Sequence, residues 1–289
     1  MLNILEDSDF RYFISPQCNR SDFIRTFLES RGLSTSILKT GNKNHILLHF
    51  PGKSYDPTFR IKTIVAHYDR VPETEGANDN SFAVFFLMQA AIKLLSYEGA
   101  HNIRIIFTDG EENSSSVVNQ GAFGLAALFK QIELSKTDVF VFDCMGRGNI
   151  PVLSETILPR SASAHFKKQY ASLESKASRI LSASTGNWLT LPVSYSDNAG
   201  FLAAGIPAVS ITMLPSKEAD NYMKLLMRTK AKKIEDLYKN EYKDALKELF
   251  PPTWFLINSH RDTLETLTSE SQEVFEKIFN SLITFRTLS

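Results

Sequence analysis

Residues 103–112 read IRIIFTDGEE, an apolar run that ends in a glycine turn and two adjacent glutamates. The run Ile103–Thr108 is mostly apolar, with Arg104 as its one charged residue, and it does not alternate strictly, which is typical of a strand buried on both faces of a mostly parallel sheet. Glu111 and Glu112 follow this strand almost directly. Adjacent carboxylates repel each other and pack poorly in a core, so the pair is either an ordinary acidic turn or part of a polar site.

Four other runs resemble this strand, and helical patterns lie between them. The predicted strands are His45–Phe50, Thr63–Ala66, Ile103–Thr108, Val139–Phe142 and Ala208–Thr212. The predicted helices run from Asn19 or Ser21 to Gly32, from Phe82 to Leu95, from Gly121 to Ile132, and onward from Ser269, where Gln272 completes a capping box. Strands that alternate with helices predict a layered α/β fold.

Composition and charge exclude several classes of protein. The chain has 289 residues, of which 43% are hydrophobic, and its 32 basic and 32 acidic side chains give no net charge. It therefore lacks the electrostatic signature of a nucleic-acid or acidic-membrane binder. Two cysteines exclude a disulfide framework. The first residues carry acids where a secretory signal would be basic and apolar, and no apolar run is long enough to span a bilayer. We expect a soluble, cytoplasmic protein with no membrane partner.

One charged segment interrupts the alternation of strands and helices. From Ser216 to Phe250 the chain is rich in Lys, Glu and Asp, and its apolar residues recur at helical spacing before Pro251 and Pro252. We interpret residues 216–252 as a charged helical insertion in a single domain that spans residues 1–289. Two hypotheses stay open for it: a solvated surface helix, which the composition favours, and a lid over a site.

Acids and histidines follow the predicted strands. His67, Asp143 and the Glu111–Glu112 pair each come after a strand, Asp79 lies in a Gly/Asn turn before a helix, and His260 lies beyond the charged segment. The carboxyl ends of parallel strands share one edge of a sheet, so we expect these side chains to converge there. Such a cluster repels itself unless a cation is present. Mixed His, Asp and Glu ligands without Cys suit zinc, or a similar divalent ion, in an open catalytic site.

The motifs that carry these residues resemble the M28 family of zinc aminopeptidases. They are HYD at 67–69, GANDN at 76–80, DGEE at 109–112, SDNAGFLAAGIPA at 196–208 and SHRDTLETL at 259–267. The resemblance extends from Thr63 to the C-terminus in the family's order. It implies a zinc-exopeptidase-like three-layer sandwich with a mixed, mostly parallel central sheet flanked by helices. It also implies peptide substrates with a free N-terminus.

The resemblance further implies a centre of two zinc ions. His67 and Asp143 would hold one ion, Glu112 and His260 would hold the other, and Asp79 would bridge the two. A non-proline cis peptide bond is implied immediately after the bridging residue.

Two further side chains receive catalytic roles from the resemblance. Glu111 would be the general base, which takes a proton from the attacking water and returns it to the leaving amine. Asp69 would contact the second ring nitrogen of His67 and so fix its tautomer. The adjacent glutamates would thus serve two tasks, one for proton transfer and the other for metal binding.

Two alternatives remain beside the aminopeptidase. Glutaminyl cyclases share similar metal motifs, use one zinc ion, and cyclise an N-terminal Gln. Those relatives commonly carry a Trp directly before the late histidine, where this chain has Ser259 and places Trp254 further upstream. The second alternative is a catalytically inactive binding module, which the presence of Glu111 and all five predicted ligands disfavours.

Overall fold

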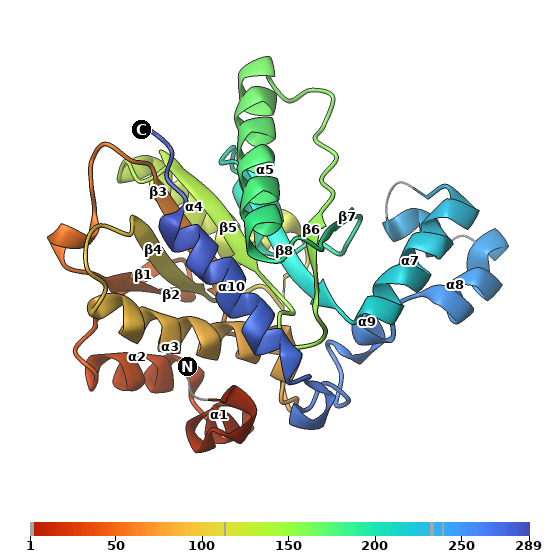
Figure 1. Ribbon diagram of the computed structural model, residues 1–289, viewed down its shortest axis with the longest axis horizontal. Helices are drawn as coiled ribbons and strands as arrows, with labels where there is room; N and C mark the ends of the chain where they lie inside the picture. The colour runs from red at the N-terminus through yellow and green to blue at the C-terminus, as the bar shows by residue number, and fades with distance from the viewer. Residues whose placement is uncertain (1–2, 113, 232–233, 239) are drawn as a thin grey trace.

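An eight-stranded sheet forms the centre of the molecule (Figure 1). The computed structural model describes residues 3–112, 114–231, 234–238 and 240–289. The strands run in the order β1-β2-β4-β3-β5-β8-β6-β7. Their bounds are β1 Ser34–Thr40, β2 Lys43–His49, β3 Ile61–His67, β4 Ile103–Thr108, β5 Thr137–Phe142, β6 Ile150–Ser154, β7 Leu189–Leu191 and β8 Ala208–Leu214.

The four central strands are parallel, and antiparallel pairs lie toward both edges. β4, β3, β5 and β8 pair in parallel, whereas β1 with β2, β2 with β4, and β6 with β8 pair antiparallel. In this register His67 at the end of β3 lies opposite Thr108 at the end of β4. The carboxyl ends of the central strands are therefore level, and the segments that follow them start from one edge of the sheet.

Helices cover both faces of the sheet. Along β5, Phe140 and Phe142 join the larger buried cluster under α3, α5 and α10, while Val139 and Val141 pack with α4 and α6 on the other face. This arrangement is the three-layer sandwich that the sequence predicts. The helices are α1 Ser8–Ile14, α2 Arg20–Glu29, α3 Phe82–Leu95, α4 Gly121–Gln131, α5 Ala164–Ser184, α6 Asp197–Ala203, α7 Ser216–Thr229, α8 Lys243–Leu249, α9 Pro252–Leu256 and α10 Glu270–Thr284.

Helix α3 is buried on nearly all sides, as its apolar sequence predicts. Phe86 stacks on Phe275 of α10 with ring centroids 4.0 Å apart, and Phe85 packs against Phe10 of α1 at 5.2 Å. The helix thus links the N-terminal helices, the sheet and α10. Because the turn before α3 carries Asp79, this packing also fixes one side of the candidate site.

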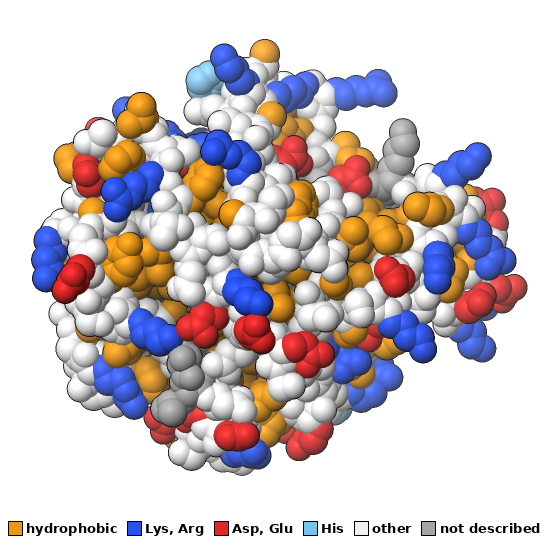
Figure 2. All heavy atoms as spheres, viewed as in Figure 1, with side chains coloured by type: hydrophobic (Ala, Val, Ile, Leu, Met, Phe, Trp, Pro, Cys, Tyr) orange, Lys and Arg blue, Asp and Glu red, His pale blue; other side chains and the backbone are white. Residues whose placement is uncertain are grey.

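The charged segment projects from one end of the molecule as α7 and α8 with two short 3-10 helices at Ile234–Tyr238 and Asn240–Tyr242, and α9 follows it (Figure 1). Its surface carries side chains of both charges (Figure 2). Its inner face is apolar, since Tyr222, Leu225 and Phe250 form a third buried cluster with Val152 of β6. Residues 232–233 and 239 of the predicted insertion lie outside the described residues. The lid hypothesis stays a prediction.

Within the described ranges, no helix combines the length and the apolar character that crossing a bilayer would require.

Candidate active site

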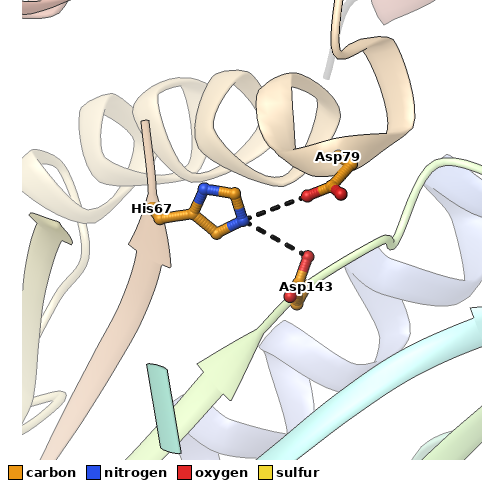
Figure 3. Close-up of side chains that lie close together, drawn as sticks. All are labelled: His67, Asp79 and Asp143. Carbon is orange, nitrogen blue, oxygen red and sulfur yellow. Dashed lines mark ion pairs between the residues drawn. The ribbon is translucent and has the colours of Figure 1, made fainter. Parts of the chain in front are cut away.

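Three side chains from separate elements meet at the carboxyl edge of the sheet (Figure 3). His67 ends β3, Asp143 follows β5, and Asp79 lies in the turn that leads into α3. The Nε2 atom of His67 lies 3.1 Å from Oδ1 of Asp79 and 3.6 Å from Oδ1 of Asp143. The structure therefore brings together three of the five predicted ligands: the carboxylates of Asp79 and Asp143 both lie beside one ring nitrogen of His67.

The polar atoms of this cluster fit a divalent cation. His67 Nε2 and Asp143 Oδ1 are both buried, and neither has a hydrogen-bond partner among the described residues. Burial alone would lower the pKa of His67, but Asp143, Asp69 and Asp79 raise this pKa well above its usual value. The site thus favours a positive charge between the imidazole and the carboxylates, and one imidazole with two carboxylates is a donor set suited to zinc.

The paired glutamates lie beside the same imidazole. One ligand atom each from His67, Glu111 and Glu112 lies within 4.8 Å of the others. The turn that presents the pair depends on Gly110, whose φ of +85° is unfavourable for other residues and whose Cβ position is filled by Lys43.

Asp69 anchors this turn. Its Oδ1 accepts a hydrogen bond from the backbone N–H of Glu111 at 3.2 Å, and its Oδ2 accepts one from the N–H of Glu112 at 3.0 Å. Toward His67 Nδ1 it presents its backbone carbonyl at 3.3 Å, with carboxylate oxygen Oδ1 at 3.6 Å. Asp69 therefore lies beside the second ring nitrogen, as the resemblance implies, but its carboxylate also holds both glutamates in place. The sequence contained no signal for this second task.

Burial dominates the electrostatics of the two glutamates. It raises the pKa of Glu111 to about 9, and the charges of Asp143, Asp197 and Asp79 act in the same direction against the opposing effect of His67. Burial likewise raises the pKa of Glu112 to about 9, with Asp79 as the next contribution. A bound cation would offset this accumulation of negative charge and favour ionised carboxylates.

A buried carboxylate from the late motif supports the turn around Asp79. Asp262 accepts hydrogen bonds from the backbone N–H groups of Asn78 at 2.8 Å and of Asp79 at 2.9 Å. The side chain of Asn80 donates to the carbonyl of Phe142 at 2.8 Å and so connects the turn to the end of β5. The peptide bond between Asp79 and Asn80 is cis, which confirms that expectation. The role of Asp262 was missed from the sequence, although its place in SHRDTLETL was a signal.

The structure does not bring His260 to the cluster. Its side chain is exposed in the turn after α9, and among the described residues it belongs to neither group of converging ligand atoms. The residue beside Glu112 is Asn258. With its amide nitrogen turned toward Glu112, Asn258 donates to both carboxylate oxygens, at 3.1 Å to Oε1 and closer still to Oε2.

A cavity of about 120 Å³ opens beside these residues. Asp79, Glu111 and Asp143 contribute carboxyl groups to its lining, and Trp254 of α9 also lines it. The remaining lining residues are Cys144, Val193, Ser194, Tyr195, Ser196, Ser210, Thr212, Ile257 and Asn258. Trp254 lies upstream of the late histidine in the sequence, but in the fold Trp254 lines the cavity.

Solved structures with this fold include peptidases and cyclases. The Legionella pneumophila LapA aminopeptidase matches with a TM-score of 0.63 and 16% identity, over 97% of this chain and 70% of its own. The Porphyromonas gingivalis glutaminyl cyclase matches with a TM-score of 0.58 and 18% identity, over 96% of each chain. BSAP, a zinc aminopeptidase from Bacillus subtilis, matches with a TM-score of 0.53 and 16% identity, over 83% of this chain and 49% of its own.

At these identities the structural matches establish the fold. No curated protein matches the sequence significantly. The model of peptidase family M28, in contrast, matches residues 46–249, which include β3, β4, β5 and all five residues of the converging cluster and its glutamate turn. The order of motifs, the three-layer fold and this match together show that the chain belongs to peptidase family M28.

Proposed function

We propose that the protein is a metal-dependent aminopeptidase that releases N-terminal amino acids from peptides. The observation that carries the proposal is the position of Glu111, which borders the same cavity as Asp79 and Asp143 and lies beside His67. Membership in family M28 supports a peptidase. The zinc aminopeptidase among the structural neighbours supports zinc as the cofactor.

A divalent ion in the cluster would supply Lewis-acid polarisation of the scissile carbonyl and acidify the attacking water. Glu111 would accept the proton of that water and pass it to the leaving amine. Asp69 would hold Glu111 in position through its backbone N–H, so that proton transfer occurs at a fixed distance.

The cavity's charge suits a free N-terminus. Its lining includes three carboxyl groups, from Asp79, Glu111 and Asp143. An α-ammonium group would be attracted there, whereas an acetylated N-terminus would lose both charge and donors. We therefore propose that peptides with a free N-terminus are the substrates. The implied count of two zinc ions stays a prediction.

The two glutamates provide the first test. Glu111→Gln keeps the size of the side chain but removes the base, so we expect turnover to fall by about 10²–10⁴-fold with metal content unchanged. In the ligand role that the resemblance implies for Glu112, Glu112→Gln lowers metal affinity as well, whereas retained metal in this variant would place Glu112 outside the ligand set. Elemental analysis and peptide hydrolysis, measured on the same preparations, would show whether the roles differ. Equal metal loss in both variants would contradict the assignment.

Glutaminyl cyclisation is the second candidate function. The P. gingivalis cyclase shares the fold over 96% of its own chain, and Trp254 lines the cavity. Peptides that begin with Gln or Leu, offered side by side and analysed by mass, separate the candidates. Release of free amino acids, blocked by N-terminal acetylation, is the expected result. Loss of ammonia from the Gln peptide without cleavage of either would establish the cyclase, and binding without any reaction would establish an inactive module.

A further inference from the structure

The turn after α9 presents an amide, not an imidazole, to the candidate metal centre. Ser259 fixes this turn: its carbonyl accepts from the N–H of Asp262 at 3.1 Å, and its hydroxyl accepts from the N–H of Arg261 at 3.2 Å. Asp262 is in turn anchored to the Asp79 turn by two hydrogen bonds. Asn258, at a φ of +56°, borders the cavity and Glu112, whereas His260, which is exposed like Asn258, does not line the cavity.

The two sides of the centre differ in the ligands they offer. On one side, His67, Asp79 and Asp143 provide an imidazole and two carboxylates, which is a complete three-residue set for a catalytic zinc ion. On the other side, Glu112 meets the amide of Asn258. A neutral amide is a poor zinc ligand, because carbonyl oxygens suit harder ions such as Mg²⁺, Ca²⁺ and Mn²⁺. With its amide nitrogen turned toward Glu112, Asn258 would also donate to both Glu112 oxygens and so occupy lone pairs that a second ion would need.

We propose that this centre binds one zinc ion tightly, through His67, Asp79 and Asp143, and that the Asn258 amide holds Glu112 in place of a second ion. The inference rests on the proposed metal-dependent function. It changes the role of Glu112 from a metal ligand to a carboxylate that is hydrogen-bonded to Asn258 beside the cavity. Asn258 is thereby the residue that sets the number of ions, and His260 has no part in metal binding.

Metal stoichiometry tests this assignment directly. The wild-type protein and the variants Asn258→His and His260→Ala would be saturated with zinc, desalted and analysed for zinc per chain by elemental mass spectrometry. We expect one ion in the wild type, one in His260→Ala and two in Asn258→His, since the new imidazole would complete a second set with Glu112 and Asp79. An Asp143→Asn variant should lose the single ion and so identify its position.

Three results would overturn the proposal: two ions retained by the wild-type protein, loss of an ion in His260→Ala, or a count in folded Asn258→His that stays at one. Circular dichroism of each variant confirms folding, and the first two measurements decide the matter even if Asn258→His does not fold. Peptide hydrolysis is not the readout. A protein with one zinc ion but no peptidase activity would contradict the proposed function while leaving the stoichiometry intact.

Discussion

At the scale of single residues, the Asp69 carboxylate links the metal cluster to the proposed base. It lies 3.6 Å from Nδ1 of His67 and accepts the backbone N–H groups of both Glu111 and Glu112. A change in its position would therefore move the imidazole and the base together. Hydrogen bonds to an ionised acceptor are stronger than neutral ones, which makes Asp69 a positioning residue for both parts of the site.

Replacement of Asp69 by Asn tests this coupling. The amide retains the size of the side chain but has one acceptor oxygen, so one of the two glutamate N–H groups loses its partner. We expect a fall in kcat/KM of about 10–100-fold, together with weaker zinc binding measured by competition with a chelator. Asp56→Asn is the matched control, because Asp56 also accepts a backbone N–H, from Thr58, and does not line the cavity. Equal effects in the two variants would reduce Asp69 to an ordinary turn residue.

The order of the motifs in the sequence predicted which side chains converge, but not the role of each one in the site. His67, Asp79 and Asp143 follow strands or precede a helix, and the topology of a parallel sheet is enough to bring them together. The choice between Asn258 and His260 depends on which way a turn faces. Residues two apart in a turn point to different places, and spacing alone does not show which of them reaches the site.

At the scale of elements, the buried and mostly apolar strands were predicted well, whereas the two strands at the outer edges of the sheet were not predicted. β4 has the predicted bounds, Ile103–Thr108. β1, with the sequence STSILKT, and β7, with three residues, lie at the edges of the sheet and carry a weaker apolar signal. The predicted capping box of α10 is wrong: Ser269 makes no side-chain cap, and Gln272 instead accepts a hydrogen bond from the N–H of Ile4 at 2.8 Å. A tertiary contact thus replaced a local one.

Asp262 connects two elements that are far apart in the sequence, the late turn and the segment before α3. Asp262→Ala would leave the buried N–H groups of Asn78 and Asp79 without an acceptor. Each orphaned donor costs about 1–3 kcal/mol, so we expect a clear fall in the free energy of unfolding, measured with denaturant. Asp262→Asn retains one acceptor oxygen and should lie between the wild type and Asp262→Ala. Unchanged stability in both variants would show that the turn is held by other contacts.

At the scale of the whole molecule, the charged segment belongs to the packed structure as much as to the surface. Tyr222 of α7 is fully buried, and its hydroxyl donates to the carbonyl of Pro192 at 2.6 Å, in the loop that leads to the cavity wall. Arg147, in the loop between β5 and β6, donates to Glu218 of α7 and to Thr253 of α9, and so connects the segment and the helix after it to the sheet. Excision of residues 216–252 would expose this apolar cluster, so single substitutions are the better test of a lid.

We expect buried histidines outside the site to make the stability of the molecule depend on pH. His101 is enclosed by aromatic rings, with Phe50 at 4.9 Å, and its Nδ1 accepts the N–H of Ile103 at 3.0 Å. Burial, with a smaller contribution from the positive charge of Lys62, lowers the pKa of His101 to about 4. In the unfolded chain the same group titrates at about 6.5. The unfolded state therefore binds more protons between these two values, and the stability present above pH 6.5 is lost as the pH falls toward 4.

Substitution of His101 by Gln should remove this part of the pH dependence. Between pH 7.5 and pH 5 we expect the wild-type free energy of unfolding to fall by about 1–2 kcal/mol more than that of the variant. The variant will be less stable at pH 7.5, because Gln does not fill the aromatic pocket, so the comparison is between slopes and not absolute values. His45, whose pKa burial also lowers to about 4, and the metal centre contribute equally to both proteins and cancel. Denaturant titrations at several pH values provide the slopes. Parallel curves for the two proteins would mean that protonation of His101 is accommodated in the folded state.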